Sequence, residues 1–200
     1  MSDGFSPPKI HSDFKPAPAG THIARVVWLI NIGWQEVKWN NETKQLPKII
    51  VGWELPNCKV EEGDHAGKPM IVTKFYTNSY AEQANLRKDL ANWRGRDLTE
   101  KEISGDFSLT TIMDKPCQVT IVHKEANNKT YANVTAITAL PQGMEAPARV
   151  HDLLMYSVDA HHEETFAKLP EWIQKKCHRQ EAVTETENPA PPEYDDDIPF

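Results

Sequence analysis

The chain has 200 residues, of which 29 are acidic and 22 are basic, so its formal net charge is −7 at pH 7. This length allows one sizeable domain with appendages, or two small domains. No apolar run approaches the length of a membrane span, and residues 1–15 lack the apolar core of a signal peptide. We therefore expect no membrane contact and a cytoplasmic location.

The negative charge is concentrated at the end of the chain. Residues 181–200 hold seven acidic side chains and no Lys or Arg, whereas the other 180 residues carry 22 charges of each sign. Net negative charge ordinarily argues against nucleic-acid binding, but here it belongs to the tail, and a neutral body can still carry a basic groove. Residues 20–141 are nearly neutral, with 15 basic against 14 acidic side chains.

Three widely separated cysteines, Cys58, Cys117 and Cys177, form no CxxC pair. Their odd number and wide spacing predict reduced, structural thiols in an intracellular protein.

The chain opens with a polar, Pro-containing stretch, residues 1–19, which we expect to be a flexible arm. A long β-prone run follows over residues 21–39, and Gly33 interrupts it. A glycine inside so long a strand pattern predicts a bulge or bend. Such a bend allows one strand to serve two sheets of a small barrel.

Four further strands and one helix follow. The helix is indicated by one apolar face, which is formed by Leu86, Leu90 and Trp93. Its expected N-cap is Asn78 or Ser79, and it is expected to end at Gly95. A capping box from Thr99 to Glu102 predicts a short turn after the helix. The expected strands are residues 48–55, 69–77, 117–123 and 130–137, with the helix at about residues 80–93.

The predicted order is β-β-β-α-β-β, with a helix between the third and fourth strands. A long bent first strand in this order is the plan of the OB-fold, a partly open five-stranded barrel that binds oligonucleotides. We therefore predict a mainly β protein with an OB-fold domain at residues 20–143. An SH3-like barrel or an α+β sheet is the alternative.

Beyond Gly143 the chain is expected to be helical and polar, forming a helical extension over residues 144–180. A short apolar patch covers residues 150–156, and a helix is expected at residues 166–179 with Pro170 in its first turn. Leu169, Trp172 and Ile173 would dock this helix on the barrel. Residues 181–200 read as a disordered acidic linker and a partner-binding tip.

That tip consists of Asp195, Asp196, Asp197, Ile198, Pro199 and Phe200. It has the chemistry of a peptide ligand: a ring for an apolar pocket, carboxylates for a basic rim, and a proline that reduces the freedom lost on docking. The run resembles the C-terminal tail of bacterial single-stranded DNA-binding proteins. The resemblance implies that this tip recruits replication and repair proteins, with Phe200 filling the partner's pocket.

A second resemblance covers most of residues 18–143. It is carried by the runs at residues 18–22, 52–56 and 86–95, which read PAGTH, GWELP and LRKDLANWRG. These runs resemble a pattern of phage-encoded single-stranded DNA-binding proteins. The resemblance implies an OB-fold and a single-stranded DNA ligand, in the host-cell cytoplasm if the protein is phage-encoded.

Binding single strands without sequence preference needs aromatic planes for the bases and cations along the phosphates. Strand alternation does not settle which way Trp28 faces, and the core is the favoured side. It places Trp53 in the core, and Trp93 completes the apolar stripe of the helix. Tyr76 is expected to be an exposed ring. The candidate DNA contacts are Arg25, Trp34, Lys38, Trp39, Lys48, Lys74, Tyr76, Arg94, Arg96, Lys124 and Tyr131.

Some of these residues have a structural alternative. Arg94 and Arg96 flank Gly95 and can complement the helix dipole as well as contact phosphate. Trp34 and Trp39 lie beyond the bulge among polar residues, where stacking on bases and a structural role are both open.

No motif predicts catalysis, a metal or a cofactor. The chain lacks a GxSxG nucleophile elbow and a phosphate-binding GxxxxGK[ST] loop. His161 and His162 would point about 100° apart on a helix, and no further ligand follows at a metal-binding spacing.

We therefore expect a non-enzymatic protein that coats single-stranded DNA during phage DNA replication, recombination or repair and recruits partners through its tail. One rival is an interaction protein that does not bind DNA and whose tail mimics the host tail to capture replication and repair proteins. A nuclease is the other rival.

Overall fold

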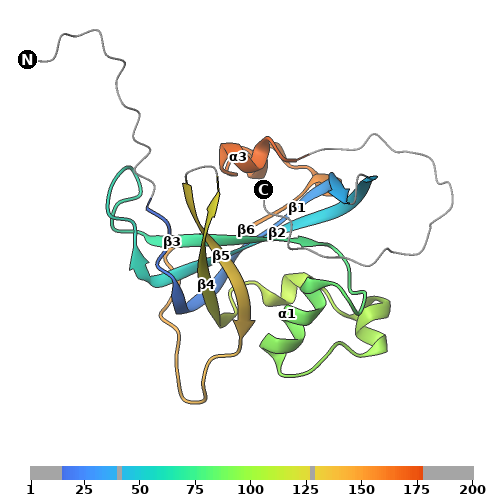
Figure 1. The fold of residues 1–200 in the computed structure, drawn as a ribbon, viewed down its shortest axis with the longest axis horizontal. Helices are drawn as coiled ribbons and strands as arrows, with labels where there is room; N and C mark the ends of the chain where they lie inside the picture. The colour runs from blue at the N-terminus through green and yellow to red at the C-terminus, as the bar shows by residue number, and fades with distance from the viewer. Residues whose placement is uncertain (1–14, 40–41, 127–128, 178–200) are drawn as a thin grey trace, which may run out of the picture.

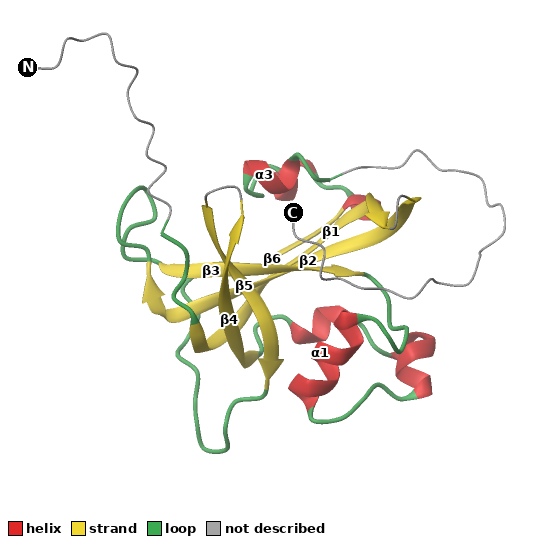
Figure 2. Cartoon of the chain, viewed as in Figure 1, coloured by secondary structure: helices red, strands yellow, loops and turns green. Residues whose placement is uncertain are grey.

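A computed structural model describes residues 15–39, 42–126 and 129–177 of the chain. The protein is mainly β, and its sheet is not closed. Figure 1 and Figure 2 show the strands crossing the centre of the molecule, with α1 below them and α3 above. The elements in chain order are β1 (Gly20–Trp39), β2 (Glu42–Lys59), β3 (Pro69–Thr77), α1 (Asn85–Arg94), η1 (Glu102–Asp106), η2 (Leu109–Ile112), β4 (Pro116–Ala126), β5 (Lys129–Thr138), β6 (Leu154–Ser157), η3 (Val158–Ala160), α2 (Glu163–Phe166) and α3 (Glu171–Gln174).

The strands follow the order β3-β2-β1-β4-β5, and β6 pairs with β1. The pairs along the main path are antiparallel, whereas β6 runs parallel to β1. β1 is long enough to have different neighbours along its length. Its first residues pair with β4, its middle pairs with β2 and β6, and its last residues pair with β2 alone.

Gly33 lies at a break in the β1–β2 register, between the pairs Asn31↔Ile49 and Gly33↔Lys48. Its φ is +77°, a left-handed conformation that costs a glycine little. The predicted bulge is therefore confirmed. Beyond it, β1 and β2 continue as a two-stranded arm, and the pairing ends at Trp39 and Glu42.

The main core lies between the sheet and α1. Leu86 and Leu90 of α1 are buried there, Trp93 packs against the core, and Trp53 of β2 is 1% exposed. The predicted core positions of these four residues are confirmed. Trp28 is half-buried and packs against a second, separate cluster.

The boundaries of α1 differ from the expectation. The helix begins at Asn85, and its N-cap is Ala84, which makes no side-chain capping bond. The hydroxyl of Ser79 instead accepts a hydrogen bond from the backbone N–H of Ala81, in the turn before the helix. Gly95 ends the helix in the left-handed region, as predicted.

The capping box after α1 is present in both directions. The backbone N–H of Thr99 donates to Glu102 Oε2 at 2.8 Å, and the backbone N–H of Glu102 donates to Thr99 Oγ1 at 3.3 Å.

The region after Gly143 is less helical than predicted. Residues 154–157 form β6. Within the described part of the expected helix over residues 166–179, only the four-residue α3 forms, with Pro170 as its N-cap, and the equally short α2 ends at Phe166, where that helix was expected to begin. A four-residue strand is too short to show a clear alternation in the sequence. Its pairing with β1, more than 120 residues earlier, decides its conformation.

The C-terminal extension builds the second apolar cluster. Ile173 is fully buried and Leu169 is 3% exposed, so their predicted docking is confirmed. The cluster lies against β1 and β2, and its buried members are Ile30, Ile32, Ile50, Tyr156, Val158, Leu169 and Ile173.

The packed part of the chain begins before Gly20. Ala17 is buried in the main core, and its carbonyl accepts a hydrogen bond from the ring of His123 at 2.8 Å. The expectation of a flexible arm over residues 1–19 therefore does not hold at Ala17.

The three cysteines are free thiols. No helix within the described residues is long and apolar enough to cross a membrane.

Candidate nucleic-acid interface

Among the described side chains of the arm formed by the ends of β1 and β2, one aromatic ring is exposed. Trp34 is 46% exposed, directly after the Gly33 bulge. Lys38 is also exposed, and strand alternation places it on the same face as Trp34, with the exposed Glu36 between them. The side chain of Trp39 and residues 40–41 lie outside the described part of the chain.

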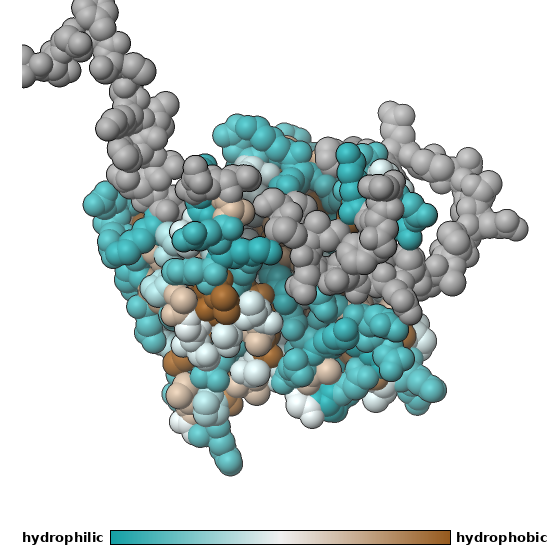
Figure 3. All heavy atoms as spheres, in the orientation of Figure 1, coloured by the Kyte–Doolittle hydropathy of each residue, from teal (hydrophilic) through white to brown (hydrophobic). Residues whose placement is uncertain are grey.

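The β4–β5 hairpin presents the second exposed ring. Tyr131 is 42% exposed and stands directly opposite Lys124 in the antiparallel register. Lys124 and the neighbouring Val122 are exposed as well. Figure 3 shows that the surface over β4 and β5 mixes hydrophobic residues with residues of intermediate and strongly hydrophilic character. The strand ends of this hairpin and the far strand ends of the β1–β2 arm both lie in the upper half of the molecule in Figure 1.

Arg25 is engaged in holding two loops against β1. Its guanidinium donates to the backbone carbonyl of Asp114 at 2.6 Å and to that of Pro147 at 3.2 Å, and it lies 3.5 Å from the Asp114 carboxylate. Lys48 is 9% exposed, and its ammonium donates to the hydroxyl of Thr77 at 2.9 Å. Both cations therefore have structural partners.

Arg94 and Arg96 converge on one carboxylate. Both donate to Glu102, which thereby joins the end of α1 to the capping box that follows. Hydrogen bonds from Arg96, from the backbone of Thr99 and from Arg94 hold the pKa of Glu102 well below its usual range. This pairing with Glu102 differs from both roles expected for the two arginines, which were to complement the helix dipole or to contact phosphate.

Tyr76 is a correction. The sequence predicted an exposed ring, but Tyr76 is 1% exposed, and its hydroxyl donates to Asp89 of α1 at 2.6 Å. Lys74 shares its face, as predicted, and its ammonium donates to the same Asp89 oxygen at 2.8 Å. The error concerned which face of β3 is covered, because the face that carries Tyr76 packs under α1.

One exposed ring was not among the candidates. Trp172 of α3 is 43% exposed, although the sequence placed it with the docking residues of the extension. A helical projection of α3 could have separated it from Ile173, since adjacent helical residues point about 100° apart.

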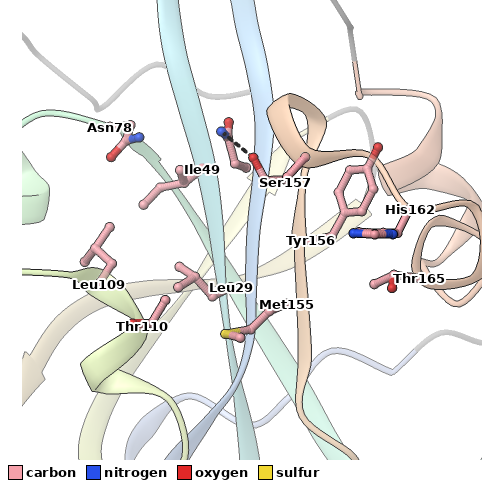
Figure 4. Close-up of a pocket in the computed structure, with 12 residues that line it drawn as sticks. Leu29, Ile49, Asn78, Leu109, Thr110, Met155, Tyr156, Ser157, His162 and Thr165 are labelled. Atoms are coloured by element: carbon pink, nitrogen blue, oxygen red, sulfur yellow. Dashed lines mark hydrogen bonds between the residues drawn. The ribbon is translucent and has the colours of Figure 1, made fainter.

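An apolar pocket of about 320 Å³ lies on another part of the surface, where β6, η2 and the β3–α1 loop meet. Figure 4 shows Leu29, Leu109 and Met155 around this space, with Asn78 at its rim. No Lys or Arg lines it, so the pocket offers nothing to neutralise a phosphate. The lining residues are Leu29, Asn31, Ile49, Asn78, Leu109, Thr110, Met155, Tyr156, Ser157, Ala160, His162 and Thr165.

Among the described residues, no group of three or more His, Cys, Asp or Glu side chains is placed to hold a metal ion. The predicted partner-binding residues Asp195, Asp196, Asp197, Ile198, Pro199 and Phe200 lie outside the described part of the chain. Chemically, the described part of the surface offers three exposed aromatic rings, Trp34, Tyr131 and Trp172. Lys38 lies on the same strand face as Trp34, and Lys124 lies directly opposite Tyr131.

The chain was compared with known proteins. No protein-family model matches it, and no curated protein shows significant sequence similarity to it.

Proposed function

We propose that this protein binds single-stranded DNA through an OB-type barrel and recruits partner proteins through its acidic C-terminal tip. The strand order β3-β2-β1-β4-β5 supports the barrel type, and β3 and β5, the two ends of this path, come close to each other. α1 follows β3 and contacts both β3 and β5, the position of the helix in an OB-fold.

The observation that carries the proposal is the exposure of Trp34 and Tyr131 on two separate hairpins, each accompanied by an exposed lysine. Bases of any sequence stack on such rings, because every base has a π-face. Lys38 and Lys124 supply cations for the phosphates between stacked bases. The binding is therefore sequence-independent and serves the replication, recombination or repair of DNA.

Proteins that bind the tip would be brought to the coated strand. Asp195, Asp196, Asp197, Ile198, Pro199 and Phe200 supply both charge and an apolar anchor for a basic-rimmed pocket. In this proposal the barrel holds the DNA, the tip holds the partner, and no catalytic step or cofactor is involved.

Tryptophan fluorescence of the full chain, titrated with oligo-dT at several salt concentrations, tests the proposal. We expect quenching that saturates at a defined number of nucleotides and an affinity that falls as salt rises. Trp34→Ala and Tyr131→Ala should each weaken binding by roughly ten-fold, since each stacked base contributes about 1–3 kcal/mol.

Lysine variants locate the phosphate path. Lys38→Ala and Lys124→Ala should each reduce the slope of log affinity against log salt by about one. Lys101→Ala is the matched control, because it also removes one exposed lysine charge, but at a site beside η1. This element lies on the lower side of the molecule in Figure 1, away from the two hairpins, so the salt slope should stay unchanged. Absence of a complex even at low salt would overturn the proposal.

The second candidate function is an interaction protein that does not bind DNA. Five of the seven candidate cations already have hydrogen-bond or ion-pair partners inside the protein, which favours this alternative. These five are Arg25, Lys48, Lys74, Arg94 and Arg96. In that case the titration gives no quenching, and a synthetic peptide of residues 194–200 competes fully with the whole chain for a tail-binding protein.

A further inference from the structure

The C-terminal extension covers the outer face of the central strands. Phe75 of β3 stands opposite Ile50 of β2, and both belong to the cluster that the extension buries. Trp28 of β1 belongs to the same cluster. An OB-type barrel binds single strands across this region, between the hairpin tips. A strand that follows this path therefore meets α3 rather than the strands beneath it.

α3 has one buried face and one outward face. Ile173 is fully buried, whereas its neighbour Trp172 is 43% exposed. The Trp172 ring rests against Phe75, with the two ring centroids 6.2 Å apart and the ring planes at 53°. Trp172 is thus held in place by a second ring while a large part of its own surface remains open to solvent.

Cations accompany this pair of rings. The ammonium of Lys176 lies 5.5 Å from the centre of the Phe75 ring. The backbone carbonyl of Lys176 accepts a hydrogen bond from Gln35 at 2.9 Å, which fastens the end of α3 to the β1–β2 arm. Lys175 is exposed, and among the described residues its ion pair is with the exposed Glu171, at 2.7 Å. An exposed pair of this kind is weak, so phosphate can replace Glu171 at little cost.

We propose that α3 forms part of the DNA-binding surface and that Trp172 stacks on a nucleobase, with Lys175 and Lys176 beside it for the phosphates. This inference rests on the proposed function and extends it. The ligand is single-stranded nucleic acid because the surface pairs an open ring with cations, the two groups that such a strand engages at every nucleotide. The C-terminal extension is then a working part of the interface as well as a cover for the sheet.

The test compares Trp172→Ala and Trp172→Phe with the unaltered full chain in the oligo-dT titration. We expect Trp172→Ala to weaken binding by about ten-fold, because a stacking plane is lost. Trp172→Phe keeps an aromatic plane and should retain affinity to within about two-fold of the unaltered chain. The Phe variant should also lose part of the total quenching, since one of the chain's six tryptophans, and one that lies in the proposed interface, is gone.

Two controls separate stacking from a structural role. Thermal unfolding reports the stability of each variant. The reaction rate of the Cys177 thiol, which is half-buried just after α3, reports whether the helix stays docked. We expect the thiol rate to stay at the level of the unaltered chain in both variants.

Each outcome decides the question. If the unaltered chain binds oligo-dT and Trp34→Ala weakens it while Trp172→Ala does not, the role of α3 is overturned and the proposed function stands. Equal losses in Trp172→Ala and Trp172→Phe, with faster Cys177 reaction, also overturn it, because undocking would then explain the loss. If the unaltered chain binds no oligonucleotide, the proposed function itself fails.

Discussion

At the scale of single residues, Glu54 is the most enclosed charged group among the described residues. It lies on β2 with no solvent exposure, and its carboxylate accepts hydrogen bonds from the backbone N–H groups of Val150 and His151. The ring of His151 lies 2.7 Å away. Glu54 therefore holds the segment that leads into β6 against the sheet.

Burial alone would raise the pKa of Glu54, but the hydrogen bonds from His151 and Val150 outweigh it, and the pKa lies below the ordinary 4.5. A carboxyl whose pKa is lower in the folded state stabilises the fold above its ordinary pKa. This contribution is lost as the pH falls through the lowered value.

Glu54→Gln should lower the free energy of unfolding by about 1–3 kcal/mol at neutral pH, because the amide nitrogen would face backbone donors. The deficit should shrink as the pH falls below 4.5 towards the lowered pKa, where the native carboxylate is itself lost. Urea unfolding across this pH range measures both effects.

Glu125→Gln makes the same chemical change at an exposed position of β4 and serves as the control. It should change stability by no more than about 0.5 kcal/mol. A Glu54→Gln deficit that stays constant or grows under acidic conditions would contradict the role assigned to this carboxylate.

At the scale of elements, α2 and α3 are only four residues long, too short to be stable without packing. Their position depends on apolar anchors, of which Ile173 is fully buried among residues of β1, β2 and β6. The extension should therefore unfold together with the sheet and not separately.

Ile173→Ala should destabilise the protein by about 3 kcal/mol, through lost burial and the cavity left behind. Chemical unfolding followed by tryptophan fluorescence gives this value. The matched control is Lys168→Ala, an exposed change in the same extension. A loss below about 1 kcal/mol would show that α3 is loosely held, and it would weaken the case for Trp172 as a fixed platform.

Elements also show what local patterns predict well. β3 spans residues 69–77 as expected, and α1 ends at Gly95, because strand alternation and a left-handed C-cap are local properties. β6 was missed because its four residues form a strand only through pairing with distant β1. The predicted start of α1, at about residue 80, was wrong, because residues 79–81 form a turn in which the Ser79 hydroxyl accepts a hydrogen bond from the backbone N–H of Ala81.

At the scale of the whole molecule, the charge is divided between a nearly neutral body and an acidic tail. Much of the positive charge expected to contact DNA is neutralised internally, by Asp89, Glu102 and Asp114 among others. The acidic tail and an anionic DNA strand would compete for the remaining exposed lysines on the two hairpins and beside α3.

Deleting residues 194–200 should leave oligo-dT affinity unchanged, or raise it at low salt by roughly two-fold to five-fold, because a competing anionic segment is removed. The same fluorescence titration measures this change. Phe200→Ala is the control, since it keeps all three aspartates and should leave DNA affinity at its original value while abolishing partner binding. A large loss of DNA affinity on deletion would contradict the competition.

The sequence by itself determined the mainly β character, the bulge at Gly33, the helix end at Gly95 and the core positions of Trp53 and Leu90, because each rests on local periodicity or backbone conformation. The tertiary structure decided which candidate side chains are accessible. Alternation predicts that Lys74 and Tyr76 share a face, but not that α1 covers it. The exposure of Trp172 likewise depends on α3 packing across β3, a contact between residues nearly 100 positions apart.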